Sequence, residues 1–218
     1  MKIKWLHLFI LIILVATGNA QNNSQDFDYG RVENGKYLNS FLHFEITLPA
    51  GWVVQSREQI DYLAKKGAAL VTGDDEKMKA VYKAAEINVA NLLGVYQYEL
   101  GSPVDYNPSI MLVAENVQHS PGVKKGSDYL FQARKLLDQS QFQYDYLDTE
   151  FEKEVVSRTD FYKMNTGIKY AGLDIKQIYF STVIKRFSLN IIISFTTDEQ
   201  KEVLLKSVHS IAFHGAGN

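Results

Sequence analysis

Residues 37–52, Tyr-Leu-Asn-Ser-Phe-Leu-His-Phe-Glu-Ile-Thr-Leu-Pro-Ala-Gly-Trp, contain the pattern that decides the fold. From Leu42 to Leu48 apolar and polar side chains alternate, which predicts a strand with one buried face. The following Pro49-Ala-Gly-Trp52 predicts a tight turn, because proline ends the strand and glycine accepts a positive φ. Trp52 is expected to be buried where this turn meets the sheet.

Further local signals lie on both sides of this segment. Asn34-Gly35 predicts a two-residue hairpin turn. Two capping boxes, Ser56 with Gln59 and Thr197 with Gln200, predict the starts of two helices. Two more helices are expected, one from Asp74 or Asp75 and one capped by Ser127. The remaining segments with strand patterns are residues 91–98, 110–117, 142–156, 160–170, 174–184 and 187–196.

Most of these strands follow one another as hairpins, with helices inserted early, midway and last. This order predicts an α+β fold, an α/β/α sandwich whose central antiparallel sheet has helices packed on both faces. The expected organisation is a signal peptide over 1–20, a flexible tail over 21–28, one domain over 29–214 and a short C-terminal tail over 215–218. No internal repeat is apparent.

Several segments together resemble the PsbP-like superfamily. They are Tyr37-Leu-Asn39, the strand 42–48, the turn Pro49-Ala-Gly-Trp52 and the ending Leu205-Lys-Ser-Val-His-Ser-Ile-Ala-Phe213. That superfamily includes the extrinsic P subunit of photosystem II and many small exported bacterial proteins of unassigned role. The resemblance implies the same α/β/α sandwich and a binding or assembly role. It implies no catalytic residues, because the matching segments are structural signatures.

The first twenty residues predict export. Lys2 and Lys4 precede an apolar run from Leu6 to Val15, and small residues end at Ala20, as in a secretory signal peptide. The apolar run is shorter than the about 20 residues that cross a bilayer, so no transmembrane anchor is expected. We expect a periplasmic or extracellular protein after cleavage near Ala20.

The composition of the chain limits which classes of partner are expected. The chain has no cysteine, so packing alone must stabilise it outside the cell. Its net charge is −2, and loss of Lys2 and Lys4 makes it more negative. Nucleic acid is therefore not an expected partner, because its binding needs a basic surface. The expected partner is another envelope or exported protein.

Catalytic and cofactor motifs are missing from the sequence. It has no Gly-x-Ser-x-Gly elbow and no glycine-rich phosphate loop. His209 and His214 are five positions apart, which does not match the i, i+4 spacing of a zinc site. No catalytic residue, metal ligand or cofactor is therefore assigned, and the protein is not expected to be an enzyme.

Two sets of residues are candidates for binding. Tyr96 with Tyr98, and Tyr144 with Tyr146, are spaced to share strand faces, and paired tyrosines anchor protein partners or stack on sugars. The favoured alternative is that these large aromatic side chains fill the space between sheet and helices, with their hydroxyls at the rim. The second set is acidic and alternates along one segment: Asp148, Glu150, Glu152 and Glu154.

In a strand all four carboxylates would point to one face, neighbours being roughly 7 Å apart, and would repel one another. A cation or a basic partner would relieve this repulsion. A flat strand offers calcium only some of its six to eight oxygen ligands, and a solvated face or protected sheet edge explains the strip as well. The sequence thus favours a non-catalytic binding or assembly protein of the cell envelope. The alternatives are a carrier of a small apolar ligand in a sheet–helix cavity and a carboxylate-based hydrolase.

Overall fold

The computed structural model describes residues 27–140 and 144–214, and the predicted signal peptide, residues 21–26 and the C-terminal tail 215–218 lie outside them. In the described ranges two antiparallel sheets are formed. The smaller has the order β1-β2-β3-β12, with strands β1 (Arg31–Glu33), β2 (Lys36–Asn39), β3 (Phe44–Thr47) and β12 (Ala212–Phe213). The larger has the order β4-β5-β6-β11-β10-β9-β7, with β8 also paired to β9. Its strands are β4 (Val53–Val54), β5 (Val89–Tyr96), β6 (Ser109–Asn116), β7 (Tyr144–Leu147), β8 (Glu152–Val156), β9 (Thr159–Tyr170), β10 (Leu173–Ile184) and β11 (Phe187–Phe195).

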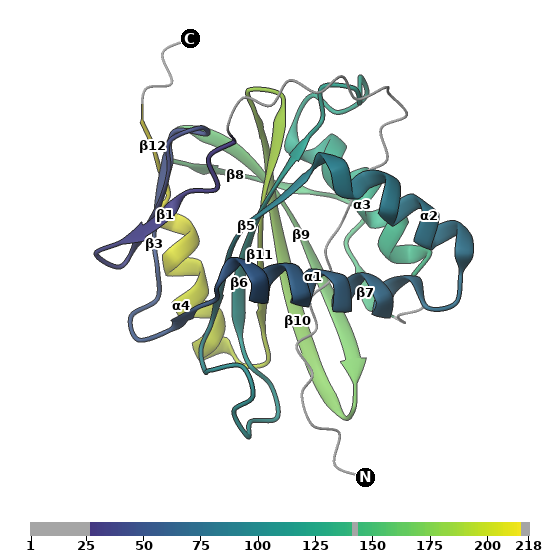
Figure 1. Ribbon diagram of the computed structural model, residues 1–218, viewed down its shortest axis with the longest axis horizontal. Coiled ribbons are helices and arrows are strands. Elements are labelled where there is room, and N and C mark those ends of the chain that lie inside the picture. Colours follow the sequence, from purple (N-terminus) through teal and green to yellow (C-terminus); the bar gives the residue numbers. More distant parts are fainter. Residues whose placement is uncertain (1–26, 141–143, 215–218) are drawn as a thin grey trace.

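Helices cover both faces of the large sheet, as expected (Figure 1). On one face α1 (Arg57–Thr72), α2 (Glu76–Ala85) and α3 (Gly126–Asp138) enclose an apolar core, and the short 3-10 helix η1 (Glu86–Asn88) leads from α2 into β5. On the other face α4 (Asp198–His209) and the small sheet enclose a second core. The α/β/α sandwich with a central antiparallel sheet is confirmed. No helix in the described ranges has the length and apolar character needed to cross a membrane.

Residues 42–48 have the predicted alternation of burial, but the strand is shorter than predicted: β3 begins at Phe44, because Leu42 and His43 form a turn in which His43 has φ 54°. Leu42, Phe44, Ile46 and Leu48 are buried, while His43 and Thr47 are exposed. Gly51 has φ 76°, and the Trp52 amide donates to the Pro49 carbonyl at 3.3 Å, closing the turn. Trp52 is only partly buried against the core of the small-sheet side, less than expected.

The capping residues identified in the sequence correctly predict where three of the four described α-helices begin. Ser56 and Thr197 form the two predicted capping boxes, and Asp75 caps α2. The prediction that Ser127 caps α3 was wrong, because the helix begins at Gly126. The Asp128 carboxylate instead accepts from the Lys124 and Lys125 amides at 3.0 and 3.1 Å.

Gly126 sits against the central sheet. A Cβ at this position would lie 1.9 Å from the Ser181 carbonyl oxygen of β10. This close approach carries Tyr129 into the core, where its hydroxyl donates to the buried Glu115 carboxylate at 2.9 Å. Burial raises the pKa of Tyr129, so this hydroxyl remains a donor.

Phe27 and Asp28, which the sequence assigned to the flexible tail, lie within the fold. The Phe27 ring contacts Phe41 and Phe187 at centroid distances of 4.8 and 5.6 Å. The Asp28 carboxylate accepts hydrogen bonds from the Ser40 hydroxyl and amide at 2.6 and 2.8 Å.

Candidate functional site

The four alternating acidic residues, Asp148, Glu150, Glu152 and Glu154, are called the acidic strip here, and they do not lie on one strand. Only Glu152 and Glu154 lie on β8, whereas Asp148 and Glu150 belong to the connection between β7 and β8. The Asp148 carboxylate turns toward β9 and accepts from the Asn165 amide and side chain at 2.8 and 2.7 Å. The prediction of a single strand over 142–156 was therefore wrong, and residues 142 and 143 lie outside the described ranges. The four carboxylates of the acidic strip therefore do not share one face of a strand.

The two carboxylates on β8 already have cationic partners. Lys163 Nζ lies 3.0 Å from Glu152 and 3.5 Å from Glu154. The Glu154 carboxylate also contacts His209 Nε2 at 2.6 Å, which joins β8 to α4. Across the described part of the chain, no cluster of three or more His, Cys, Asp or Glu side chains is arranged to hold a metal ion. Lys163 and His209 of this chain thus occupy the positions that a cation or a basic partner would take at Glu152 and Glu154.

The four tyrosines do not form a common surface. Tyr96 is buried, with 2% of its surface exposed, and Tyr144 packs partly buried against the core. Tyr98 and Tyr146 are exposed, but Tyr98 follows β5 while Tyr146 lies on β7 at the other end of the strand order. A register shift between Tyr144 and Tyr146 turns them to different faces, and the Tyr146 ring covers Gly167 of β9.

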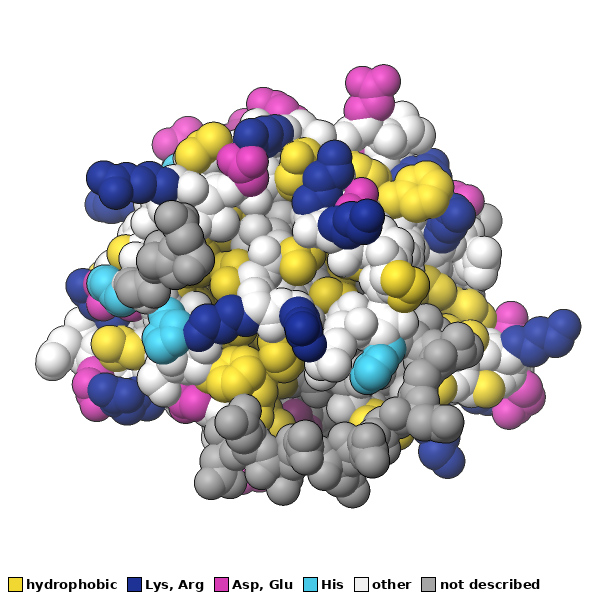
Figure 2. Space-filling model, turned by 90° about the horizontal axis from the view of Figure 1, so that it is seen from above, with side chains coloured by type: hydrophobic (Ala, Val, Ile, Leu, Met, Phe, Trp, Pro, Cys, Tyr) yellow, Lys and Arg dark blue, Asp and Glu magenta, His cyan; other side chains and the backbone are white. Residues whose placement is uncertain are grey.

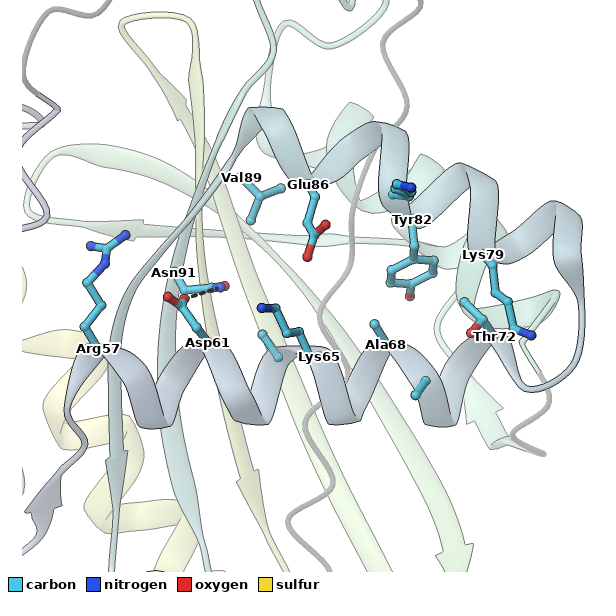
Figure 3. Close-up of a pocket in the computed structure, with 13 residues that line it drawn as sticks. Arg57, Asp61, Lys65, Ala68, Thr72, Lys79, Tyr82, Glu86, Val89 and Asn91 are labelled. Atoms are coloured by element: carbon cyan, nitrogen blue, oxygen red, sulfur yellow. Dashed lines mark hydrogen bonds between the residues drawn. The ribbon is translucent and has the colours of Figure 1, made fainter.

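A groove that the sequence analysis did not identify lies between α1 and α2. We call it the helix groove. It has a volume of about 420 Å³, within the size range of small-ligand sites. Ala64, Ala68 and Ala69 leave room on the α1 side, and Tyr82 and Val89 contribute apolar surface from the opposite side (Figure 3).

Cations outnumber carboxylates in the helix groove. Arg57 and Lys65 of α1 and Lys79 and Lys83 of α2 line it, together with the carboxylates of Asp61 and Glu86. Each carboxylate comes from a different wall, and Asn91 donates to Asp61 at 3.4 Å. Lys79 is bound to Glu76 at 2.8 Å, which leaves Arg57, Lys65 and Lys83 as the main positive groups.

This excess is local. On the face of the molecule shown in Figure 2, cationic, anionic and hydrophobic side chains are interspersed. The whole chain carries a net charge of −2, so the cations of the helix groove stand out against the composition. An anion entering the groove is attracted by Arg57, Lys65 and Lys83 and repelled by the carboxylates of Asp61 and Glu86, so a small positive excess remains beside the apolar wall.

The spacing of these residues was visible in the sequence. Arg57, Asp61, Lys65, Ala68 and Thr72 follow one another at i, i+4, i+8, i+11 and i+15, which places them on one stripe of α1. Lys79 and Lys83 are likewise four apart on α2. What the sequence did not show is that these two stripes face each other.

Burial raises the pKa of Tyr82, which forms part of the groove wall. Its hydroxyl therefore stays neutral and adds no negative charge to the site. Tyr82 is 4% exposed, so it lines the inner part of the groove wall and not the rim.

No protein-family model and no curated protein sequence matches this chain. Comparison of structures does find similar folds. The solution structure of cyanobacterial PsbP (CyanoP) from Synechocystis sp. PCC 6803 superposes with a TM-score of 0.51 at 11% identity, covering 85% of this chain and 96% of the other.

Two further structures are more distant. LpqN of Mycobacterium tuberculosis, described as involved in cell envelope biogenesis, gives a TM-score of 0.44 at 11% identity over 78% of this chain and 82% of LpqN. A protein of Bacteroides thetaiotaomicron VPI-5482 gives 0.43 at 11% identity, over 86% of this chain and 51% of that protein. The match to CyanoP, together with the sheet order and the helices on both faces, assigns this chain a PsbP-like fold.

Proposed function

We propose that the chain is a non-catalytic exported binding protein, and that its helix groove holds an organic anion with an apolar portion. The observation that carries this proposal is the groove itself: cations at its rim, alanine and tyrosine side chains at its walls, and space of about 420 Å³. The signal-like residues 1–20 support an envelope location.

The charge distribution favours an anion over the purely apolar ligand considered from the sequence. Lys65 and Lys83 are exposed at the rim, so they approach a bound anion without large desolvation. The apolar wall adds affinity for a hydrocarbon portion in proportion to the area it covers. An envelope component or a protein segment that carries a carboxylate or phosphate meets both requirements.

The carboxylate-based hydrolase has less support. Such chemistry needs two carboxylates facing each other across a cleft, and Asp145 to Glu154 was the only source expected from the sequence. The helix groove does hold two carboxylates on opposite walls, Asp61 and Glu86, but Asp61 accepts a hydrogen bond from Asn91 and cations outnumber carboxylates there, which favours binding of an anion. Glu152 and Glu154 lie on one strand and are bound by Lys163 and His209. None of the four strip residues lines the helix groove.

Calorimetric titration tests the proposal with two probes that share a twelve-carbon chain and differ in head-group charge. The chain starting at Gln21 is titrated below the micellar concentration with dodecanoate and with dodecyltrimethylammonium. We expect dodecanoate to bind and the cation not to bind. The Lys65→Glu/Lys83→Glu double variant should bind dodecanoate at least about tenfold more weakly, since about 1.4 kcal/mol corresponds to tenfold and each reversed charge contributes on that order.

The matched control is Lys176→Glu/Lys206→Glu, which makes the same charge change at exposed positions on β10 and α4. It should bind dodecanoate within twofold of the native chain. Equal binding of the two probes, equal weakening by both double variants, or no binding of dodecanoate would refute the proposal.

A further inference from the structure

A second groove lies where the edges of the two sheets face each other. We call it the edge groove. Tyr29, Gly30, Arg31 and Val32 form the wall on the small-sheet side, and Asn91, Leu92 and Leu93 of β5 form the opposite wall. Val54 and Gln55 also line the space, whose volume is about 320 Å³. Figure 1 shows β1 and β5 next to each other at this place.

β1 is an edge strand of the small sheet, and β5, although it lies between β4 and β6, has an unpaired stretch on the β4 side within the described residues. On the side away from β6, β5 is paired to β4 only through Val95 and Tyr96, and the Gln55 amide donates to the Gly94 carbonyl at 2.9 Å. Within residues 27–140 and 144–214, no strand pairs with Val89–Leu93 on that side. Among the described strands, β1 pairs with β2 and with no other. Backbone groups along an unpaired edge are available to a further strand.

Two buried amide oxygens at this groove have no hydrogen-bond donor within the described part of the chain. They are Oε1 of Gln55 and Oδ1 of Asn91. Gln55 is 4% exposed, so water has little access to its side-chain oxygen. Buried polar atoms are nearly always hydrogen-bonded, and these two are acceptors that require N–H or O–H groups. Both oxygens are closed off from solvent, so the groups open to a peptide are the unpaired backbone groups of Val89–Leu93 and not these two acceptors.

The side chains that line the edge groove define the chemistry of the peptide. Tyr29, Val32 and Val54 are 37%, 40% and 39% exposed, which is high for large apolar residues beside a groove. Arg31 and Arg57 line the same space, and no Asp or Glu of the described residues lines it with them. Arg31 is already paired with Glu33 at 2.6 Å, so an acidic partner would compete with Glu33 there, whereas Arg57 forms no ion pair within the described ranges. The Arg57 guanidinium lies 3.2 Å above the Tyr29 ring centre, which holds this cation at the groove.

We propose that the edge groove binds an extended segment of a partner protein as an additional strand beside Val89–Leu93. The segment alternates apolar side chains, which cover Val32 and Val54, with acidic side chains that meet Arg31 and Arg57. Five residues of β5 span roughly 16 Å, so four or five peptide residues fill the edge. Binding by strand addition obtains affinity from the main chain and selectivity from alternate side chains.

The arginines also argue against a second copy of this chain as the occupant. Edge-to-edge pairing of two copies would bring Arg31 and Arg57 of one copy close to the same residues of the other. The register shift between Asn91 and Leu93 twists this edge, a feature that hinders pairing of identical edges. This inference does not depend on the helix groove, although Arg57 and Asn91 line both.

The test selects ten-residue peptides from a random displayed library against the chain starting at Gln21, and then measures the synthesised peptides. We expect the selected sequences to alternate apolar and acidic residues. Bound peptide should slow amide hydrogen exchange within residues 89–93 at least about tenfold, as new backbone hydrogen bonds do. Val32→Lys and Arg31→Glu, both at exposed positions, should each weaken binding at least tenfold.

Two controls separate the edge groove from other effects. Lys176→Glu makes a charge reversal on β10 and should leave peptide binding within twofold. Lys65→Glu/Lys83→Glu should also leave it within twofold, while abolishing the dodecanoate response if that proposal holds. Failure of one proposal is thus recognised independently of the other.

Three results would overturn the inference. The first is that no peptide is selected, or that selected peptides protect other segments or ignore the Val32 and Arg31 variants. The second is a dimer by light scattering with residues 89–93 protected in the absence of peptide, which makes a second copy the occupant. The third is that removal of residues 21–26 exposes those amides, which makes the protein's own N-terminal segment the occupant.

Discussion

Replacement of Gly126 by alanine tests the closest contact between a helix and the large sheet. Gly126 is the first residue of α3, and an added Cβ would lie 1.9 Å from the Ser181 carbonyl oxygen, 2.5 Å from its carbon and 3.1 Å from the Thr182 nitrogen. All three atoms belong to the backbone of β10, which is paired on both sides by β9 and β11. The strand cannot move aside, so α3 must retreat by about 1 Å or more to reach ordinary contact distance.

The expected cost follows from what this retreat disturbs. Overpacking of a close contact costs about 1–3 kcal/mol. The retreat also displaces Tyr129, whose hydrogen bond to the buried Glu115 carboxylate is worth about 1–3 kcal/mol when its loss leaves the carboxylate poorly satisfied. Alanine stabilises a helix by up to about 1 kcal/mol relative to glycine, which offsets part of this loss of folding free energy. The net expectation is a loss of about 3 kcal/mol.

Thermal and urea unfolding measure this loss. For a domain of this size about 3 kcal/mol corresponds to a Tm lower by about 6–12 °C, with an unchanged urea slope. Gly122→Ala is the matched control, since a Cβ there meets only Gln132 Nε2 at 3.9 Å. It should change the stability by less than about 1 kcal/mol. If the two variants unfold within about 2 °C of each other, the contact between Gly126 and β10 does not hold α3 in place as argued.

Three further predictions concern the ends of the chain and the acidic strip. Hydrogen bonds from the Ser40 hydroxyl, and then from the Gly30 and Ser40 amides, hold the pKa of Asp28 below its ordinary 3.8, so its contribution to stability is present above that pH and is lost as the pH falls through the lower folded-state pKa. The Tm difference between the native chain and Asp28→Asn should therefore shrink as acid is added below pH 3.8, and a constant difference would contradict the assignment. Calorimetric titration with millimolar calcium should give no heat, because Lys163 and His209 already bind Glu152 and Glu154; heat that disappears in Glu150→Gln/Glu152→Gln would show a cation site. Intact mass of the exported protein should correspond to a chain beginning at Gln21, and a species that retains residues 1–20 in the envelope would contradict the cleavage prediction.

Features set by neighbouring residues were predictable from the sequence. The capping boxes at Ser56 and Thr197 depend on a side chain and an amide three positions apart, and the structure has both. Asn34-Gly35 likewise forms its turn with φ values of 50° and 72°. The alternation over 42–48 fixed which face of β3 is buried, because a strand has a period of two.

Features set by tertiary contacts were not predictable. The start of α3 at Gly126 depends on the approach to Ser181, which is distant in the chain. The segment 142–156 has the composition of one strand, but Asp148 leaves it to bind Asn165. The turn at Lys185-Arg186 was located correctly by the predicted strands 174–184 and 187–196; its φ values of 49° and 68°, reached without glycine or asparagine, are imposed by the long paired strands on both sides.

The same distinction applies to the candidate sites. Each stripe of charged residues on α1 and α2 follows from helical spacing, but the helix groove exists only because the two helices lie against each other. The edge groove depends on two sheets, and nothing in a single strand indicates which backbone edge remains unpaired.

The pairing of the small sheet has a consequence for how the chain reaches its native state. β12 is the last strand in sequence and pairs with β3 near the start, through Ala212 with Glu45 and Phe213 with Phe44. The His214 amide then donates to the His43 carbonyl at 2.7 Å. β3 can pair with β2, which directly precedes it in the chain, but its other edge stays open until residues 212–214 are in place. Closing the small sheet thus brings together segments about 170 residues apart in sequence, and pairing at such a separation slows folding.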